Sequence, residues 1–162
     1  MSLLDSSLTV VAKLEKGFVR PQDPFIAPKQ YFDLYPPDSL KPWSDPADMT
    51  AVPKESVGFG DYGKAFSKFT EQDWRELLCA DCAGTSFMDA QLGRVLDALD
   101  RKQLWDNTLV IFVGDHGYHT GERQWWNKNT LFERSCRAPL IIAAPGMKGG
   151  RTTRSLVEFV DL

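Results

Sequence analysis

Two adjacent side chains, Asp115 and His116, are of types that bind divalent metal ions. They directly follow the apolar run 109–113 (Leu-Val-Ile-Phe-Val). Ligands of open α/β sheets bind at the carboxyl ends of strands, so both side chains emerge where a site is expected. A carboxylate oxygen and an imidazole nitrogen are two plausible metal donors, and Gly114 and Gly117 allow tight turns around them. The structural alternative is an ordinary turn in which Asp115 caps a helix.

A long helix and two buried strands are predicted around this pair. Thr70 is a good helix N-cap, and Asp73 stands at the third helical position, close to a capping box. The helix predicted over 71–101 carries one apolar stripe at three- and four-residue steps, formed by Trp74, Leu78, Cys82, Thr85, Met88, Leu92, Leu96 and Leu99. The runs 109–113 and 139–143 show no polar alternation, which is typical of strands buried on both faces.

Less regular structure is predicted on either side of these elements. Leu8–Leu14 is rich in β-branched residues and predicts a short strand. Eight of the ten prolines fall between Pro21 and Pro53, so residues 36–63 are predicted to form a long proline-rich surface loop. The pattern over 155–162 is helix-like and stops without a C-cap or glycine, which suggests truncation.

The order helix, buried strand, loop, buried strand, helix is typical of an α/β protein with a mostly parallel sheet. Only about three strands are predicted, whereas a sheet usually has roughly five or six. We therefore expect the chain to be part of a larger α/β domain.

Composition narrows the classes of partner. Hydrophobic residues make up 43% and the net charge is −3, so no basic surface indicates nucleic acid, and the apolar runs are too short to span a membrane. No export signal is visible at the N-terminus. The three cysteines are Cys79, Cys82 and Cys136. The first two have CxxC spacing inside the predicted helix, without a second pair to complete a zinc site, so we expect small, mostly buried helix residues.

Several motifs occur together in a fixed order. They are 114–117 (Gly-Asp-His-Gly), 121–122 (Gly-Glu), 126–133 (Trp-Asn-Lys-Asn-Thr-Leu-Phe-Glu), 137–142 (Arg-Ala-Pro-Leu-Ile-Ile) and 145–146 (Pro-Gly), with the upstream segments 17–25, 27–35 and 87–99. This combination resembles the sulfatases of the alkaline-phosphatase superfamily, most of all the iduronate-2-sulfatase group, over about residues 10–162. The resemblance implies an alkaline-phosphatase-like three-layer sandwich with a mostly parallel sheet. Residues 1–162 would then be a partial catalytic domain without the N-terminal part that bears the nucleophile.

The resemblance also implies site residues. Asp115 and His116 would be two ligands of the catalytic divalent cation, usually Ca²⁺ in this family. Lys128 would contact a sulfate oxygen and the leaving-group side, where a cation stabilises developing charge. The alternative for Lys128 is a solvated surface lysine. Trp126 and its neighbour Trp125 would line the substrate pocket, or else be ordinary buried aromatics.

Two neighbouring residues are given smaller roles. His119 stands where relatives vary and is interpreted as a loop histidine. Glu122 matches the family's Gly-Glu and is interpreted as a structural carboxylate.

The chain departs from the family at two points. Gln22 stands where the family has a substrate-side histidine, and glutamine forms hydrogen bonds but cannot shuttle a proton near neutral pH. The nucleophile motif Cys/Ser-x-Pro-x-Arg, whose first residue becomes formylglycine, is not found in the sequence. The run 136–140 has its proline one place late and lacks the arginine. The paired aspartates that complete the family's metal shell are also missing.

Three functions remain open from the sequence. The first is a sulfate-ester hydrolase fragment that contributes half of a metal and sulfate site and is inactive alone, with a sulfated sugar or aryl sulfate as substrate of the complete enzyme. The second is a phosphate or phosphonate ester hydrolase of the same superfamily. The third is a catalytically dead, stand-alone remnant that acts as a binding module. Relatives are often exported or lysosomal, which is the compartment that the resemblance implies.

Overall fold

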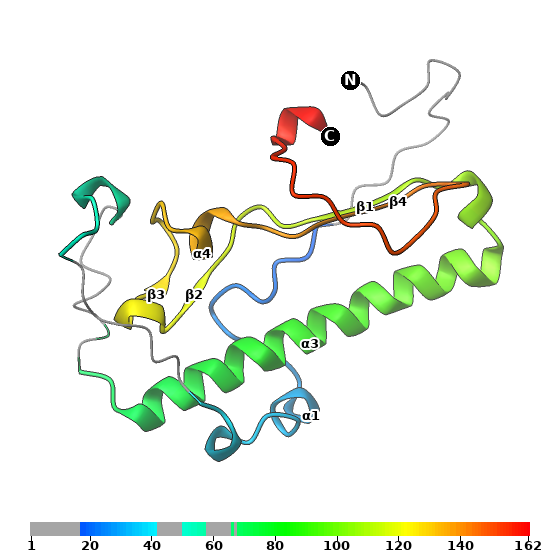
Figure 1. Ribbon diagram of the computed structural model, residues 1–162. Coiled ribbons are helices and arrows are strands. Elements are labelled where there is room, and N and C mark those ends of the chain that lie inside the picture. The colour runs from blue at the N-terminus through cyan, green and yellow to red at the C-terminus, as the bar shows by residue number, and fades with distance from the viewer. Residues whose placement is uncertain (1–16, 42–49, 58–65, 67) are drawn as a thin grey trace.

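The computed structural model describes residues 17–41, 50–57, 66 and 68–162 (Figure 1). The predicted strand Leu8–Leu14 and parts of the loop 36–63 lie outside the described residues. The α-helices and strands are α1 (Lys29–Phe32), α3 (Glu71–Lys102), β1 (Val110–Val113), β2 (His119–Thr120), β3 (Trp126–Asn127), α4 (Glu133–Cys136) and β4 (Leu140–Ala143). Short 3₁₀ turns are η1 (Pro37–Ser39), η2 (Lys54–Ser56), η3 (Trp105–Asn107), η4 (Glu122–Gln124) and η5 (Phe159–Asp161).

The helix α3 begins at the predicted cap. The Thr70 side chain accepts a hydrogen bond from the Asp73 amide at 3.2 Å, and the Thr70 amide donates to Asp73 Oδ2 at 2.7 Å. This reciprocal pair satisfies backbone donors that the first turn leaves free. The helix ends where Gln103 adopts a left-handed conformation, with φ of 54°. The predicted helix and its capping box are confirmed.

The buried face of α3 differs from the predicted stripe. Its fully buried residues are Cys79, Ala83 and Gly84, whereas Thr85 is exposed and the other residues of the stripe are half-buried. The burial has a local cause, because residues 17–27 run from the sheet towards α3 and bring Pro21 against Gly84 (Figure 1). A Cβ at position 84 would lie 3.4 Å from Pro21 Cα, so the packing is close.

The strands form two antiparallel pairs. β1 pairs with β4 in the register Val110↔Ala143 to Val113↔Leu140, so both predicted strands form and they are neighbours. β2 pairs with β3 to form a small hairpin.

The predicted mostly parallel sheet is wrong for the described strands, because the segment between β1 and β4 folds as the hairpin and α4 and returns the chain in the opposite direction. Full burial is also wrong. Alternate residues are open to solvent, with Ile111 38% and Ile141 61% exposed.

An aromatic cluster joins the hairpin to the first half of α3. Trp126 is 2% exposed, and its ring centroid lies 5.8 Å from that of Trp74 on α3. Phe25 and Tyr118 meet Trp126 edge to face, at 6.4 and 6.3 Å between ring centroids. Aromatic pairs prefer such edge-on and tilted geometries. The cluster fixes the segments that carry the candidate site to one another.

The predicted helix over 155–162 is wrong. Only the 3₁₀ turn η5 forms there, and Leu156 and Val160 are 99% and 88% exposed. Most helical stability in proteins comes from packing of an apolar face. This segment stays extended because its apolar side chains meet little of the described chain.

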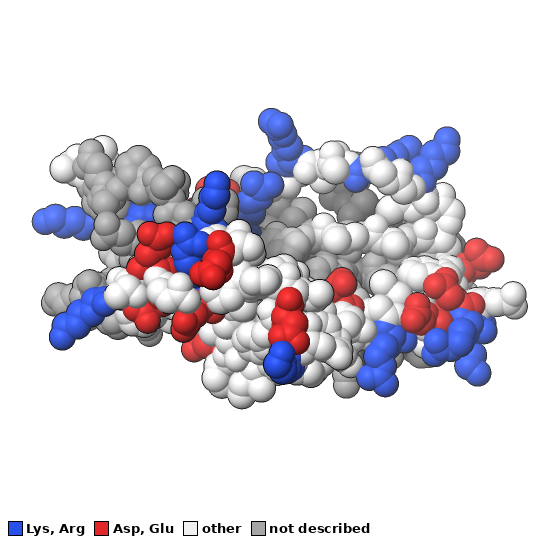
Figure 2. All heavy atoms as spheres, turned by 90° about the horizontal axis from the view of Figure 1, so that it is seen from below, with Lys and Arg blue, Asp and Glu red and all other residues white. Residues whose placement is uncertain are grey.

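Charges of both signs are interspersed on the face that carries α3 (Figure 2). None of the described helices has the length and apolarity of a membrane span.

Candidate functional site

The candidate site begins where β1 ends. The Gly114 amide donates to the Pro139 carbonyl at 3.0 Å, which extends the β1–β4 pairing by one step. A Cβ at position 114 would lie 2.9 Å from Pro139 Cδ. Glycine is therefore required for the close approach that places Asp115 and His116 just beyond the strand.

The hydrogen bonds of His116 assign which of its ring nitrogens carries a proton. Its Nδ1 lies 2.7 Å from the Gly117 carbonyl oxygen, which can only accept, so Nδ1 carries the proton. The lone pair of Nε2 then faces Lys128, whose Nζ donates to it at 2.9 Å. The tautomer is assigned from this hydrogen-bond pattern. Asp115 Oδ2 lies 3.6 Å from the same Nε2, on a side chain that is 85% exposed.

Lys128 connects this strand end to the N-terminal segment. Its Nζ also donates to Gln22 Oε1 at 3.0 Å, across 106 positions of sequence. Arg20 fixes the turn that carries Gln22, because its guanidinium donates to the Gln22 carbonyl at 3.3 Å and to the Ile26 carbonyl at 3.1 Å. The structure thus brings together Asp115, His116, Lys128 and Gln22.

The donor set fits two ligands of a divalent cation. His116 donates its Nδ1–H to a backbone carbonyl, which is how metal-binding histidines are usually oriented, and its Nε2 lone pair lies beside a carboxylate. The described residues hold no cluster of three or more His, Cys, Asp or Glu side chains able to share one metal. Asp115 and His116 are two donors, fewer than a divalent cation takes, so the described residues do not form a complete metal site.

Lys128 is carried on a tightly turned strand end. The flanking residues Asn127 and Asn129 have φ of 94° and 70°, a left-handed conformation that asparagine tolerates better than most residues. The Lys128 amide donates to Asn127 Oδ1 at 2.8 Å. These turns direct the lysine out of the hairpin.

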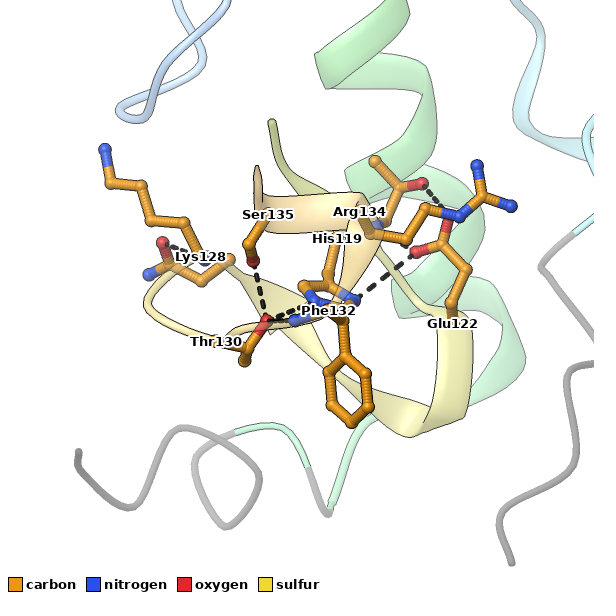
Figure 3. A network of polar contacts seen from close by, with 9 residues as sticks. His119, Glu122, Lys128, Thr130, Phe132, Arg134 and Ser135 are labelled. Carbon is orange, nitrogen blue, oxygen red and sulfur yellow. Dashed lines mark hydrogen bonds and ion pairs between the residues drawn. The ribbon is translucent and has the colours of Figure 1, made fainter. Parts of the chain in front are cut away.

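A buried polar cluster lies behind Lys128 (Figure 3). His119 Nε2 is 2.8 Å from Thr130 Oγ1, which is 2.8 Å from Ser135 Oγ. Burial lowers the pKa of His119, so its ring is neutral. The interpretation of His119 as a loop histidine is wrong, because it lies in β2 with 1% of its surface exposed.

Glu122 is a buried carboxylate, only 3% exposed, beside this cluster. It accepts from the Thr120 amide at 2.7 Å and lies 3.4 Å from Arg134 Nε. These contacts agree with its interpretation as a structural carboxylate. No spacing in the sequence distinguished this cluster, because its members come from a hairpin and a four-residue helix that become neighbours only on folding.

Trp126 points into the aromatic cluster, and among the described residues its contacts are those of a packing residue. The cysteines behave as expected of small helix residues, since Cys79 is buried and Cys82 half-buried, both as free thiols. Burial raises the pKa of both thiols and keeps them protonated.

The sulfatase family model matches residues 55–162. The chain belongs to the sulfatase family. A sulfatase of Formosa agariphila is 33% identical over 153 residues, which cover 92% of this chain and 30% of the relative. The choline-sulfatase of Rhizobium meliloti is 34% identical over 140 residues, with coverage of 85% and 27%. The iduronate 2-sulfatase of Mus musculus is 30% identical over 186 residues, with coverage of 92% and 34%. This sulfatase chain spans about a third of the length of these relatives.

Solved structures agree on the fold. The phosphonate monoester hydrolase of Silicibacter pomeroyi superposes with a TM-score of 0.68 at 27% identity, over 81% of this chain and 28% of that protein. The phosphonate monoester hydrolase of Agrobacterium radiobacter gives 0.64 at 27% identity, over 80% and 28%. The mixed α/β arrangement of this sulfatase chain is therefore shared with phosphonate monoester hydrolases.

Proposed function

We propose that the chain forms part of a sulfate-ester hydrolase site, within a partial catalytic domain of the alkaline-phosphatase-like three-layer sandwich. The observation that carries the proposal is the meeting of Asp115, His116 and Lys128 with Gln22, which lies 106 positions from Lys128 in the sequence. Lys128 Nζ lies 2.9 Å from His116 Nε2 and 3.0 Å from Gln22 Oε1, with Asp115 beside the same imidazole. Membership of the sulfatase family supports the same assignment.

In this proposal Asp115 and His116 are two ligands of a divalent cation, Ca²⁺ in the complete enzyme. The cation, when bound, would polarise a sulfate oxygen. The Nδ1–H bond to Gly117 holds the His116 lone pair in position, so the ring needs no reorientation to bind.

Lys128 is the proposed catalytic and substrate-binding cation. The His116 lone pair can bind either the cation or Lys128, but not both. With the cation bound, the Lys128 ammonium would face the sulfate oxygens and the leaving-group side. A fixed positive charge there stabilises the charge that develops on oxygen as the ester bond breaks.

Gln22 is the proposed neutral contact on the substrate side. Its amide oxygen accepts from Lys128, and its NH₂ group is a donor of the kind that binds a sulfate or leaving-group oxygen. It would bind without exchanging a proton. The proposed substrate class is a sulfate ester of a sugar or aryl group, and the iduronate 2-sulfatase among the relatives supports the sugar ester.

Calorimetry with Ca²⁺ and with Zn²⁺ tests the metal ligands, on the natural chain and on Asp115→Ala. Calcium takes about six to eight oxygen ligands, so we expect weak calcium binding by two protein ligands. An imidazole favours Zn²⁺, so we expect measurable zinc binding that Asp115→Ala weakens. Tight stoichiometric calcium binding would contradict the partial shell. Zinc binding that is unchanged in Asp115→Ala would place the metal elsewhere.

A phosphonate ester hydrolase is the second candidate, favoured by the two superposed phosphonate monoester hydrolases. NMR titrations with an aryl sulfate and with an aryl phosphonate monoester separate the two. We expect the aryl sulfate to shift the Lys128 and His116 signals at lower concentration. Lys128→Gln should abolish the response, whereas Lys148→Gln, at an exposed lysine outside the site, should preserve it. Stronger binding of the phosphonate would favour the second candidate.

A further inference from the structure

Four polar side chains are buried together behind Lys128: His119, Glu122, Thr130 and Ser135, with exposed fractions of 1%, 3%, 5% and 6%. Figure 3 shows them gathered between the β2–β3 hairpin and α4. Buried polar groups are costly unless they are paired, so such a cluster needs a reason.

The tautomer of His119 assigns the donor and the acceptor of each hydrogen bond in the cluster. The His119 ring is neutral, and its Nδ1 faces the Glu122 carboxylate with Oε2 at 4.0 Å. A proton on Nδ1 is favoured there, because a bare lone pair would face the negative charge. His119 Nε2 is then an acceptor for the Thr130 hydroxyl at 2.8 Å.

Thr130 is fully satisfied in this arrangement. Its oxygen accepts from the Ser135 hydroxyl at 2.8 Å and from the Phe132 amide at 3.4 Å, while its own proton goes to His119. His119 Nδ1 has no hydrogen-bond partner among the described residues, so the network is satisfied at Thr130 and not at every atom. The three hydrogen bonds at Thr130 hold the segment from β3 to α4, which carries Lys128.

The cluster also reaches the other side of the candidate site. The Ser135 carbonyl accepts from the Gly117 amide at 2.8 Å, and the Gly117 carbonyl accepts from His116 Nδ1 at 2.7 Å. Ser135 thus connects by its side chain to Thr130, two residues from Lys128, and by its backbone to the support of His116.

We propose that His119, Thr130 and Ser135 are positioning residues that keep the Lys128 side chain next to the His116 ring at the candidate site. The proposal deepens the function proposed above and rests on it for the role of Lys128. A nucleophilic role for Ser135 does not fit, because its hydroxyl is buried and points at Thr130 rather than towards Lys128 (Figure 3).

Thr130→Val tests the proposal, since it keeps the shape of the side chain and removes the central hydroxyl. The measurement is the nuclear Overhauser cross-peak between the Lys128 side chain and the His116 ring, with urea unfolding on the same samples. We expect Thr130→Val to lose the cross-peak while the chain stays folded, and Thr130→Ser to restore it. Ser135→Ala should lose it as well.

Ala83→Gly is the matched control, because it loosens a fully buried position of α3 without removing a polar group of the cluster. It should lower the urea midpoint and leave the cross-peak unchanged. If Thr130→Val does not fold, Ser135→Ala decides by the same cross-peak.

A cross-peak preserved in every folded variant would overturn the proposal and leave the cluster a purely structural one. The function proposed above fails independently, if Lys128→Gln leaves binding of the aryl sulfate unchanged while the cross-peak of the natural chain is present.

Discussion

Gly117 is the more tightly enclosed of the two glycines that flank Asp115 and His116. A Cβ built there would lie 2.0 Å from the Arg134 carbonyl oxygen and 2.9 Å from that of Arg137. Both obstacles are backbone atoms of α4 and its end, so neither can move aside like a flexible side chain. The His116 support therefore depends on a residue without a side chain.

Gly117→Ala is expected to lower the free energy of unfolding by about 3 kcal/mol, the upper range for overpacking a tight site. Urea unfolding followed by circular dichroism measures the change. Gly93→Ala is the control, because a Cβ at position 93 meets nothing within 4 Å and alanine is a better helix former by about 1 kcal/mol. Equal effects of the two substitutions would contradict the steric argument.

Asp81 is expected to make stability depend on pH. Burial and, secondarily, the Glu122 carboxylate raise the pKa of Asp81 from 3.8 to about 6. The folded chain therefore holds this proton more tightly than the unfolded chain, and stability falls as pH rises from about 4 to about 6.

Asp81→Asn removes that charge and is expected to raise the free energy of unfolding at pH 7.5 by about 2 kcal/mol, with no gain below about pH 4. Urea unfolding across this pH range measures the difference. Asp89→Asn, at an exposed carboxylate of the same helix, should give no comparable gain at neutral pH. A gain that is equal at both ends of the range would show that charge is not the cause.

Individual residues differ in how far the sequence reveals them. Asp115, His116, Lys128 and Gln22 were singled out through fixed motifs, and the structure places them within contact of one another. The roles assigned to them remain predictions. His119 could not be recognised as buried, because its burial depends on the pairing of two-residue strands that carry no periodic signal.

Elements whose signals are local were the ones predicted well. The cap, length and period of α3 are determined by residues close together in the sequence, and both ends of the helix fall close to the prediction. The direction of β1 against β4 depends instead on the path of 26 intervening residues (114–139), and a continuous apolar run contains no such information.

Thr70→Ala is expected to cost about 1 kcal/mol of stability, because the first turn of α3 loses its side-chain acceptor. Thermal and urea unfolding both measure the loss. Thr85→Ala makes the same substitution at an exposed position within the helix, where alanine should stabilise by a few tenths of a kcal/mol. A loss at both positions would mean that the cap contributes nothing particular.

At the scale of the whole molecule, the family was recognisable because many motifs occur in one order, which no single motif would have indicated. Family membership does not by itself show that the chain carries every catalytic group. The sequence has no match to the family's nucleophile motif, although it has Lys128 and the two residues predicted as metal ligands, Asp115 and His116.

The purified chain is therefore expected to show no turnover of an aryl sulfate, with or without added Ca²⁺, since covalent catalysis cannot proceed without a nucleophile. A continuous assay of released phenol, with a complete sulfatase as positive control, measures this. Turnover that Asp115→Ala abolishes would show that the chain holds a nucleophile outside the recognised motif.

The solvent exposure of alternate residues in β1 and β4 has a consequence for handling the protein. Within the part of the chain that the structure describes, β1 and β4 pair only with each other. Ile111, Val113 and Ile141 present apolar surface beside the strand edges left there, a combination that favours pairing between molecules. Such pairing grows with concentration and, being driven by apolar contact, weakens on cooling. Samples of this chain should therefore keep best when stored dilute and cold. When a concentrated sample is warmed, turbidity should appear at a temperature well below that at which α3 melts.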